Sequence, residues 1–331
     1  MLADTWVVFD GPVDSVWVES MNSVLDDSRT LCLASNERIK LPSSMRLMFE
    51  VEDLALASPA TVSRCGMVFM EPRQLGWKPI VDSWLAALPE TMATHIAYLQ
   101  SLFETVVPPC LEYVTKNCKP VIPTDDIGQV SNLTRMLGTL LDEFRVPAST
   151  KPAVTDGSDG GSTAVTVPAA VEQQQAWLDS LFAFATVWSI GAGTDAAGRA
   201  HFSEFFQQLT GSTGARPLRV PFPTGAEAVS AGAGANSTDV VPANAAVGAS
   251  VYDFVFNKAT STWQHWMSTI PLYRVPDNAE FHEIIVPTID TVRTSWLLET
   301  LLTHQRHTLL VGETGTGKTI AVHKKIVHEL D

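Results

Sequence analysis

The sequence lacks the cysteine patterns of metal sites and of disulfide frameworks. Its four cysteines, Cys32, Cys65, Cys110 and Cys118, include no Cys-x-x-Cys pair, and the eight histidines show no ligand-like spacing with them. We therefore expect buried or surface thiols in a reducing compartment.

Long apolar runs and basic charge are also scarce. No uncharged run approaches the roughly 18 residues of a membrane-spanning helix, and Asp4 and Asp10 interrupt the apolar N-terminal stretch, unlike a signal peptide. Lysine and arginine number 22 against 36 acidic residues, giving a net charge of −14. Because phosphate backbones bind basic surfaces, we expect a soluble intracellular protein with no nucleic-acid or membrane partner.

A phosphate-binding motif is present near the C-terminal end. It fits G-x-x-x-x-G-K-[ST] at every fixed position and consists of Gly312, Glu313, Thr314, Gly315, Thr316, Gly317, Lys318 and Thr319. The apolar run 308–311 predicts a buried parallel strand before it, and residues 320–330 predict an amphipathic helix after it. A chance match by a glycine-rich turn is the alternative, and this context argues against it.

The motif residues have a defined chemistry. Glycines let backbone N–H groups turn toward phosphate oxygens. Lys318 would reach the β- and γ-phosphates of ATP, and the Thr319 hydroxyl would ligate Mg²⁺. Only twelve residues follow the motif, although it opens a nucleotide-binding domain. We therefore expect the chain to be part of something larger.

Residues 6–70 alternate short apolar runs with helical spacing. This alternation predicts a parallel sheet covered by helices. The expected strands are 6–9, 31–34 and 67–70.

Residues 73–210 show successive helical stripes, which predict an all-α subdomain. The stretches 147–171 and 223–249 have no apolar period and indicate flexible loops or insertions. A second module begins in the late 200s, with a helix expected from about Val292 to Leu302 before the strand that precedes the phosphate motif. The expected class is α/β, with a P-loop sheet and an all-α lid.

Asp10 closes the first apolar run, at the sheet edge where ligands of α/β proteins bind. In P-loop NTPases a Mg²⁺-organising carboxylate occupies this place, often followed by a glutamate that positions the attacking water. Gly11 follows here, so a general base worth about 10²–10⁴ in rate would be missing. The alternative is a strand-ending Asp-Gly-Pro turn.

Three further polar residues are candidates for nucleotide contacts. Arg64, in a Ser-Arg-Cys step, resembles the arginine finger of clamp-loader ATPases of the AAA+ class, and an ordinary surface ion pair is the alternative. Asn36 is placed for a polar sensor of the γ-phosphate. Arg199 is either a second sensor or a cation on a helix surface.

Together these segments resemble dynein heavy chains. Residues 6–22, 24–27 and 57–67 look like the second AAA+ module of that family. Residues 284–293, followed by the motif at 312–319, resemble the entry to the third module in a form like axonemal dyneins. The resemblance is strong over 5–72, 175–209 and 281–328, and weak across the two low-complexity stretches.

The resemblance implies four regions. They are the C-terminal part of the α/β subdomain of the second module (1–72), its helical lid with an insertion at 147–171 (73–210), a low-complexity insertion and linker (211–270), and the start of the third module with its P-loop (271–331). These boundaries are expectations that follow from the family.

The resemblance also implies a function. The parent would be a ring of six AAA+ modules that uses ATP hydrolysis for minus-end-directed microtubule sliding in cilia and flagella. Arg64 would be the finger offered to the first module's nucleotide, and Asp10 the Mg²⁺-side carboxylate of the second module. Gly11 would match a second module that holds nucleotide without turnover. The motif at 312–319 would open the third module's regulatory ATP site.

Partners and location follow from the same resemblance. They are neighbouring AAA+ modules of the same chain, microtubules through the parent's stalk, intermediate and light chains through its tail, and the cytoplasm, cytoskeleton and axoneme. Two alternatives stay open: a stand-alone P-loop ATPase that combines Asp10 with Lys318, and a non-catalytic scaffold or truncated gene product.

Overall fold

The computed structural model describes residues 5–11, 15–51, 53–55, 57–145, 167–168, 170–223, 249–271, 273 and 286–326. The chain divides into two compact units, Met1–Glu71 and Pro72–Asp331. Most of the expected loop at 147–171 and nearly all of the one at 223–249 lie outside the described residues.

The first unit contains short elements. Its strands form one antiparallel hairpin, with Leu31 opposite Ile39. The elements are α1 (Ser15–Ser20), α2 (Asn22–Leu25), β1 (Thr30–Cys32), β2 (Arg38–Lys40) and α3 (Pro59–Val62).

Two of the strands expected in this unit do not form in its described residues. Residues 6–9 and 67–70 carry no ladder, and Val8 and Val68 are 80% and 83% exposed. The run at 31–34 overlaps β1, which pairs antiparallel rather than parallel. A parallel strand needs flanking strands for its hydrogen bonds and helices for its burial, and the described part of this unit supplies neither to these runs.

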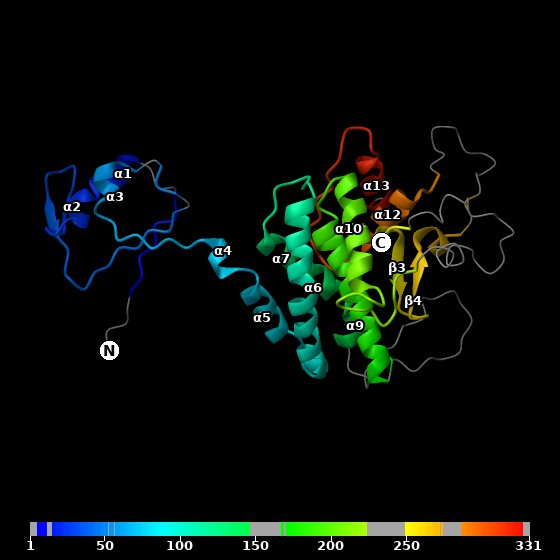
Figure 1. The fold of residues 1–331 in the computed structure, drawn as a ribbon. Helices are drawn as coiled ribbons and strands as arrows, with labels where there is room; N and C mark the ends of the chain where they lie inside the picture. Colours follow the sequence, from blue (N-terminus) through cyan, green and yellow to red (C-terminus); the bar gives the residue numbers. More distant parts are fainter. Residues whose placement is uncertain are drawn as a thin grey trace, which may run out of the picture. The chain divides into compact units, whose positions relative to one another are not determined.

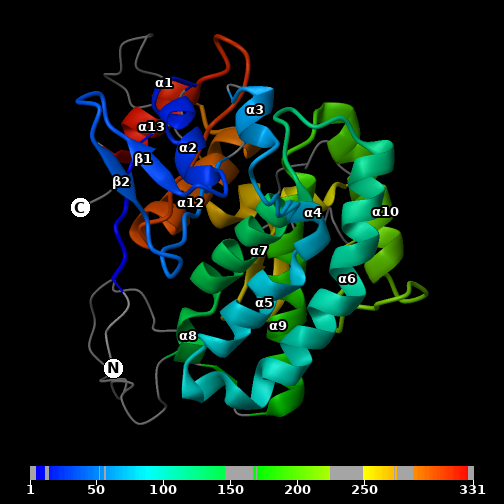
Figure 2. The same ribbon diagram turned by 90° about the vertical axis from the view of Figure 1, so that its left-hand side faces the viewer.

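The second unit is built around long helices that run alongside one another (Figure 1, Figure 2). The helical character expected for residues 73–210 is confirmed in the described part of that range. The elements are α4 (Pro72–Leu75), α5 (Lys78–Ala86), η1 (Glu90–His95), α6 (Ile96–Asn117), α7 (Asp126–Leu140), α8 (Asp142–Arg145), α9 (Val171–Thr186), the π-helical turn η3 (Val187–Gly191) and α10 (Ala196–Thr210).

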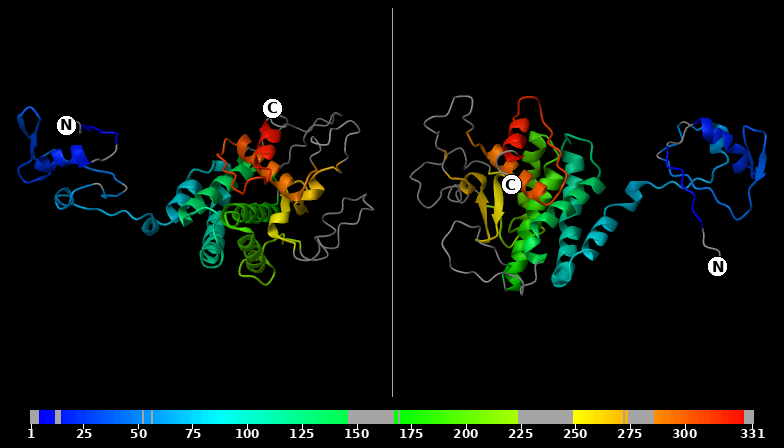
Figure 3. Two further views of the ribbon diagram at one scale, coloured as in Figure 1. Left: turned by 90° about the horizontal axis from the view of Figure 1, so that it is seen from above. Right: turned by 180° about the vertical axis from the view of Figure 1, so that it is seen from behind.

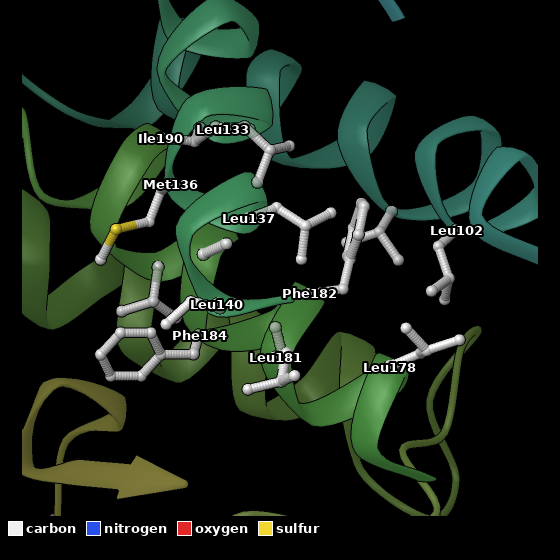
Figure 4. Packing of buried hydrophobic residues seen from close by; sticks show 14 of the residues in the cluster. Leu102, Leu133, Met136, Leu137, Leu140, Leu178, Leu181, Phe182, Phe184 and Ile190 are labelled. Atoms are coloured by element: carbon white, nitrogen blue, oxygen red, sulfur yellow. The ribbon is translucent and has the colours of Figure 1, made fainter. Parts of the chain in front are cut away.

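Apolar stripes at helical spacing bring these helices together. Leu102 of α6, Leu137 of α7 and Phe182 of α9 are buried in one cluster (Figure 4). Two helices begin at aspartate caps: the side chain of Asp125 accepts from the Gly128 amide, and that of Asp195 accepts from the Gly198 amide, each at 2.7 Å. Burial and caps together fix where the helices start and which face is inside.

A β-hairpin adds to the same core, and it lies at the flank of the helices in Figure 3. We expected residues 211–270 to be a low-complexity insertion and linker, but 250–270 is folded. Phe254 and Trp266 are fully buried, so their burial against the helices offsets the ordering of this segment. Its elements are η5 (Val251–Asp253), β3 (Phe254–Asn257), β4 (Thr262–His265), antiparallel to β3, and η6 (Trp266–Thr269).

Helices α12 (Ile289–Thr303) and α13 (Lys318–Lys324) end the described chain. The helix expected near 292–302 is confirmed as α12. Trp296 anchors it, since its ring lies 5.4 Å from that of Phe184 and 5.5 Å from that of Trp266. The run 308–311, expected as a parallel strand, forms no strand among the described residues, and Leu309 is 77% exposed.

Candidate functional site

The phosphate motif forms an exposed turn that leads into α13. Gly315 and Gly317 have φ angles of +86° and +78°, in the left-handed region that side chains disfavour. Gly317 is the residue that precedes the first helical residue, Lys318. The backbone of this turn therefore requires glycine at positions 315 and 317.

Lys318 folds back over the turn. Its Nζ donates to the carbonyl oxygen of Gly312 at 2.8 Å and to that of Glu313, and lies 3.1 Å from Thr316 Oγ1. A Cβ added at Gly312 would lie 3.3 Å from Thr316 Oγ1, so a side chain there would crowd the hydroxyl that lies beside the ammonium. A half-exposed ammonium held inside a glycine turn has the donor chemistry that a phosphate group needs.

Helix α12 connects this turn to the helical core. Glu299 of α12 accepts from Lys325 Nζ at 2.6 Å, just beyond the last residue of α13. A second contact joins this helix to the core: Nε2 of His304, the residue after α12, lies 2.5 Å from Asp142 Oδ2 of α8. With Trp296 in the aromatic cluster, these contacts position the phosphate turn relative to the helices of the second unit.

Arg64 is held in the first unit by local contacts. Its Nε donates to Asp26 Oδ1, and its Nη1 donates to the carbonyl oxygen of Ala60 at 2.6 Å. The preceding helix is capped by Ser58, and Thr61 Oγ1 donates to Asn22 Oδ1 at 2.9 Å. This is the surface ion pair that the alternative to an arginine finger predicts. The finger role stays a prediction.

The other candidate residues belong to elements other than the phosphate turn. Asp10 is exposed at the end of an extended run, and Asn36 is exposed in the β1–β2 turn with φ +66°; both belong to the first unit. Arg199 lies in the second unit, where its Nη1 donates to the Thr194 carbonyl oxygen at 2.9 Å. Arg199 lines a cavity that includes no residue of the phosphate turn.

The cysteines and the other possible metal ligands of the described residues form no cluster. The four cysteines are free thiols, and burial raises the pKa of Cys110. No group of three or more histidine, cysteine, aspartate or glutamate residues is arranged to hold a metal within the described ranges. In the same part of the chain, no helix has the length and apolar character to cross a membrane.

A buried polar cluster at Asp179 was not predicted from the sequence. This carboxylate is 2% exposed; Tyr98 donates to its Oδ1 at 2.5 Å, and Arg219 Nη1 donates to its Oδ2 at 2.6 Å. Burial and then the hydrogen bond to Asp179 raise the pKa of Tyr98 to about 12. The cluster ties the segment after α10 to α6 and α9. An aspartate inside the apolar stripe of α9 was the one available signal.

Two family models match the sequence. The "Dynein heavy chain AAA lid domain" matches residues 99–268, and the "P-loop containing dynein motor region" matches residues 273–331. The lid match extends over the β3–β4 hairpin, in agreement with the packing of that hairpin against the helices.

Much longer relatives show the same likeness. The chain is 37% identical to human "Dynein axonemal heavy chain 3" over 98% of its own length and 7% of the relative. It is 35% identical to mouse "Dynein axonemal heavy chain 2" over 96% of its length and 6% of the relative. It is 36% identical to rat "Dynein axonemal heavy chain 12" over 98% of its length and 10% of the relative. The chain thus spans a tenth or less of these relatives.

Proposed function

Because the chain belongs to the dynein heavy chain family, we propose that it forms part of a motor ring, running from the second AAA+ module through its lid into the third module. The succession of lid match and P-loop match along the chain supports this order. The family and the AAA+ fold class expected from the sequence are confirmed by the same matches. The boundaries at residues 72, 210 and 270 remain predictions.

The turn at 312–319 is proposed to bind the phosphates of ATP. The observation that carries this proposal is the position of Lys318 Nζ inside the turn, 2.8 Å from the Gly312 carbonyl oxygen. On binding, the ammonium exchanges these backbone acceptors for phosphate oxygens, which form stronger, charge-assisted hydrogen bonds. Bound Mg²⁺ would neutralise part of the phosphate charge. The Thr319 hydroxyl would hold the Mg²⁺ ion of this site, and Asp10 would hold the Mg²⁺ ion of the second module's separate site.

Helix α12 is proposed to couple this nucleotide site to the lid before it. The Lys325–Glu299 pair joins α12 to the helix after the turn, and the His304–Asp142 contact and Trp296 join α12 to the lid helices. A change in the conformation of the turn on nucleotide binding would therefore be transmitted to α12, which packs against the lid helices. Such coupling between modules is what a ring motor requires.

The remaining nucleotide contacts are proposals that follow from the family. Arg64 would leave Asp26 to reach the nucleotide of the preceding module, and Asn36 would sense a γ-phosphate. For Arg199, a sensor role toward the 312–319 turn is not favoured, because its cavity includes no residue of that turn. A sensor role toward the second module's own nucleotide stays a proposal.

The activity of the whole motor is likewise proposed. The relatives are named axonemal dynein heavy chains, which supports a place in the axoneme of cilia or flagella and work as an ATP-driven, minus-end-directed microtubule motor. Neighbouring AAA+ modules, microtubules, and intermediate and light chains would be its partners. A stand-alone ATPase or an inactive scaffold is not favoured, because relatives match over nearly the whole chain.

Equilibrium titration with labelled ATP tests the nucleotide site. We expect weak binding, and sub-micromolar affinity would contradict a site completed by other parts of the ring. Lys318→Ala should weaken binding by about 1.5–3 kcal/mol, or roughly 10- to 150-fold. Lys119→Ala, an exposed lysine before α7, is the matched control. Equal affinity in the two variants would remove Lys318 from the site.

A further inference from the structure

The second unit contains a surface cavity of about 280 Å³ whose lining includes no residue of the phosphate turn. One wall is a face of α10 with Arg199 and Ser203, another is the segment 249–253, and Arg293 of α12 completes it. The cavity thus joins the last long helix of the lid to the helix that leads into the phosphate turn.

Both arginines are fixed and keep donors available. Arg199 uses one N–H for the Thr194 carbonyl oxygen. Arg293 pairs with Asp290 through Nη2, and its guanidinium lies over the ring of Trp188, with Cζ 5.8 Å from the ring centroid. A guanidinium carries five N–H donors, so each retains several beyond the bonds formed within the described residues. Their geometry is set before any ligand arrives.

Two polar side chains near the two guanidinium groups lack a hydrogen-bond partner in the described part of the chain. Burial raises the pKa of Tyr252, and the charges of Arg199 and Arg293 act in the opposite direction, so both lie near this side chain. The buried Tyr252 hydroxyl and the Trp188 indole N–H find no hydrogen-bond partner among the described residues. Both groups can act as hydrogen-bond donors. Arg293 has Asp290 as its ion-pair partner, and Arg199 has no carboxylate partner in the described part of the chain.

Two carboxylates also line the cavity. Asp253 accepts from the Ser250 amide at 2.9 Å in the turn that starts η5, so its charge is engaged by the backbone. Glu204 is exposed on α10, where solvent screens it. Neither is paired with Arg199 or Arg293 in the described part of the chain.

We propose that this cavity binds a small phosphate-containing anion between the guanidinium groups of Arg199 and Arg293. Paired guanidinium forks match the geometry of phosphate oxygens better than ammonium groups do. The volume lies just under the roughly 300–1,000 Å³ of ordinary ligand pockets, which suits one or two phosphate groups rather than an enclosed nucleotide. The bound anion would tie α10 to α12, and this role is independent of ATP binding at 312–319.

The indole N–H of Trp188 provides a local readout by NMR. The full chain, labelled with ¹⁵N at its nine tryptophans, is titrated with inorganic phosphate. Every protein in this titration also carries Lys318→Ala, which weakens phosphate binding at the 312–319 turn. The Trp188 signal is assigned by its loss in Trp188→Phe. We expect this signal to shift with saturation.

Variants decide whether the two arginines hold the anion. Arg199→Gln and Arg293→Gln should each weaken phosphate binding by roughly 10- to 100-fold, the loss of a charge-assisted contact. Arg293→Lys should fall between, since it keeps the charge and loses the fork. Arg135→Gln, on the exposed face of α7, should bind as the parent does, and circular dichroism checks that all variants fold.

Several results would overturn the proposal. They are a Trp188 signal that does not move, equal binding in the glutamine variants and Arg135→Gln, or acetate binding as tightly as phosphate. An arm with AMP separates the two sources of the anion: tighter binding than inorganic phosphate indicates a nucleotide phosphate, and equal binding indicates free phosphate. Failure of ATP binding at the turn would leave these outcomes unchanged.

Discussion

The carboxylate of Glu299 lies 2.6 Å from the ammonium of Lys325, which joins the helix before the phosphate turn to the helix after it. Lys325 is 7% exposed in its side chain and Glu299 is 51% exposed. Glu299→Gln should therefore destabilise this connection by about 1–2 kcal/mol, less than the 3–5 kcal/mol of a fully buried pair, because solvent screens the glutamate.

Hydrogen exchange of residues 308–326 measures this effect. We expect faster exchange there in Glu299→Gln and unchanged exchange in α6. Glu104→Gln, an exposed glutamate on α6, serves as the control. Exchange at 308–326 that is the same in the two variants would mean that α12 does not position the turn through Glu299.

Arg64 and Asp26 allow the finger role to be separated from the ion pair. In the full motor, Arg64→Ala should slow hydrolysis at the preceding module by about 10³–10⁵ if the guanidinium completes the transition state. Asp26→Ala frees the same guanidinium and should leave turnover near that of the parent. If both variants change turnover alike, or Arg64→Ala stays within twofold, Arg64 is only a partner of Asp26.

The buried Asp179 should matter more for stability than either of its hydrogen-bond donors. Asp179→Asn removes the charge opposite Arg219, whose side chain is 41% exposed, so we expect a loss of about 2–3 kcal/mol, below the fully buried value. Tyr98→Phe removes one hydrogen bond and should cost about 1 kcal/mol. Urea unfolding of the chain measures both losses of stability. Surface substitutions usually change stability by less than about 0.5 kcal/mol, so a loss that small for Asp179→Asn would contradict the cluster's structural role.

The helices were predictable because their information is local. The stripe of α7 includes Val130, Leu133 and Leu137, and all three are buried, as the 3.6-residue period requires. The phosphate turn was predictable for a similar reason, since its glycines and Lys318 lie within eight residues and impose their own geometry.

The strand predictions were wrong because strand formation depends on partners that are distant in the sequence. The apolar run at 67–70 has the composition of a buried strand, but a strand forms only when neighbours complete its ladder. Distance along the sequence also concealed the pairing of Arg219 with Asp179, 40 residues apart. The hairpin at 254–265 was hidden by the low-complexity stretch before it, although Trp263 and Trp266 marked an apolar segment.

Buried histidines predict a loss of stability in mild acid. Burial lowers the pKa of His95 below its ordinary 6.5, and the ring packs edge-on against Phe144 at 5.6 Å. The unfolded chain therefore takes up a proton near pH 6.5, before the folded chain does, so stability is full above this pH and declines as the pH falls toward the lowered folded value.

Urea unfolding between pH 7 and pH 5 measures this decline. His95→Gln should reduce the pH dependence of the unfolding free energy, because it removes a side chain whose pKa differs between the folded and unfolded chains. His201→Gln, whose side chain is exposed on α10, should keep the dependence of the parent. Equal slopes in all three proteins would show that His95 does not contribute.

Substitution of Gly315 should be destabilising because of its backbone conformation and not because of a steric clash. A Cβ at Gly315 would meet nothing within 4 Å, but its φ is +86°, so Gly315→Ala should cost about 1–2 kcal/mol in the left-handed conformation. Gly193→Ala also meets open space and has no left-handed φ, which makes it a matched control. Because the strain falls on the turn itself, Gly315→Ala should weaken labelled-ATP binding by roughly 5- to 30-fold, and Gly193→Ala should leave it unchanged. Parental affinity in Gly315→Ala would mean that the turn binds nucleotide in another backbone conformation.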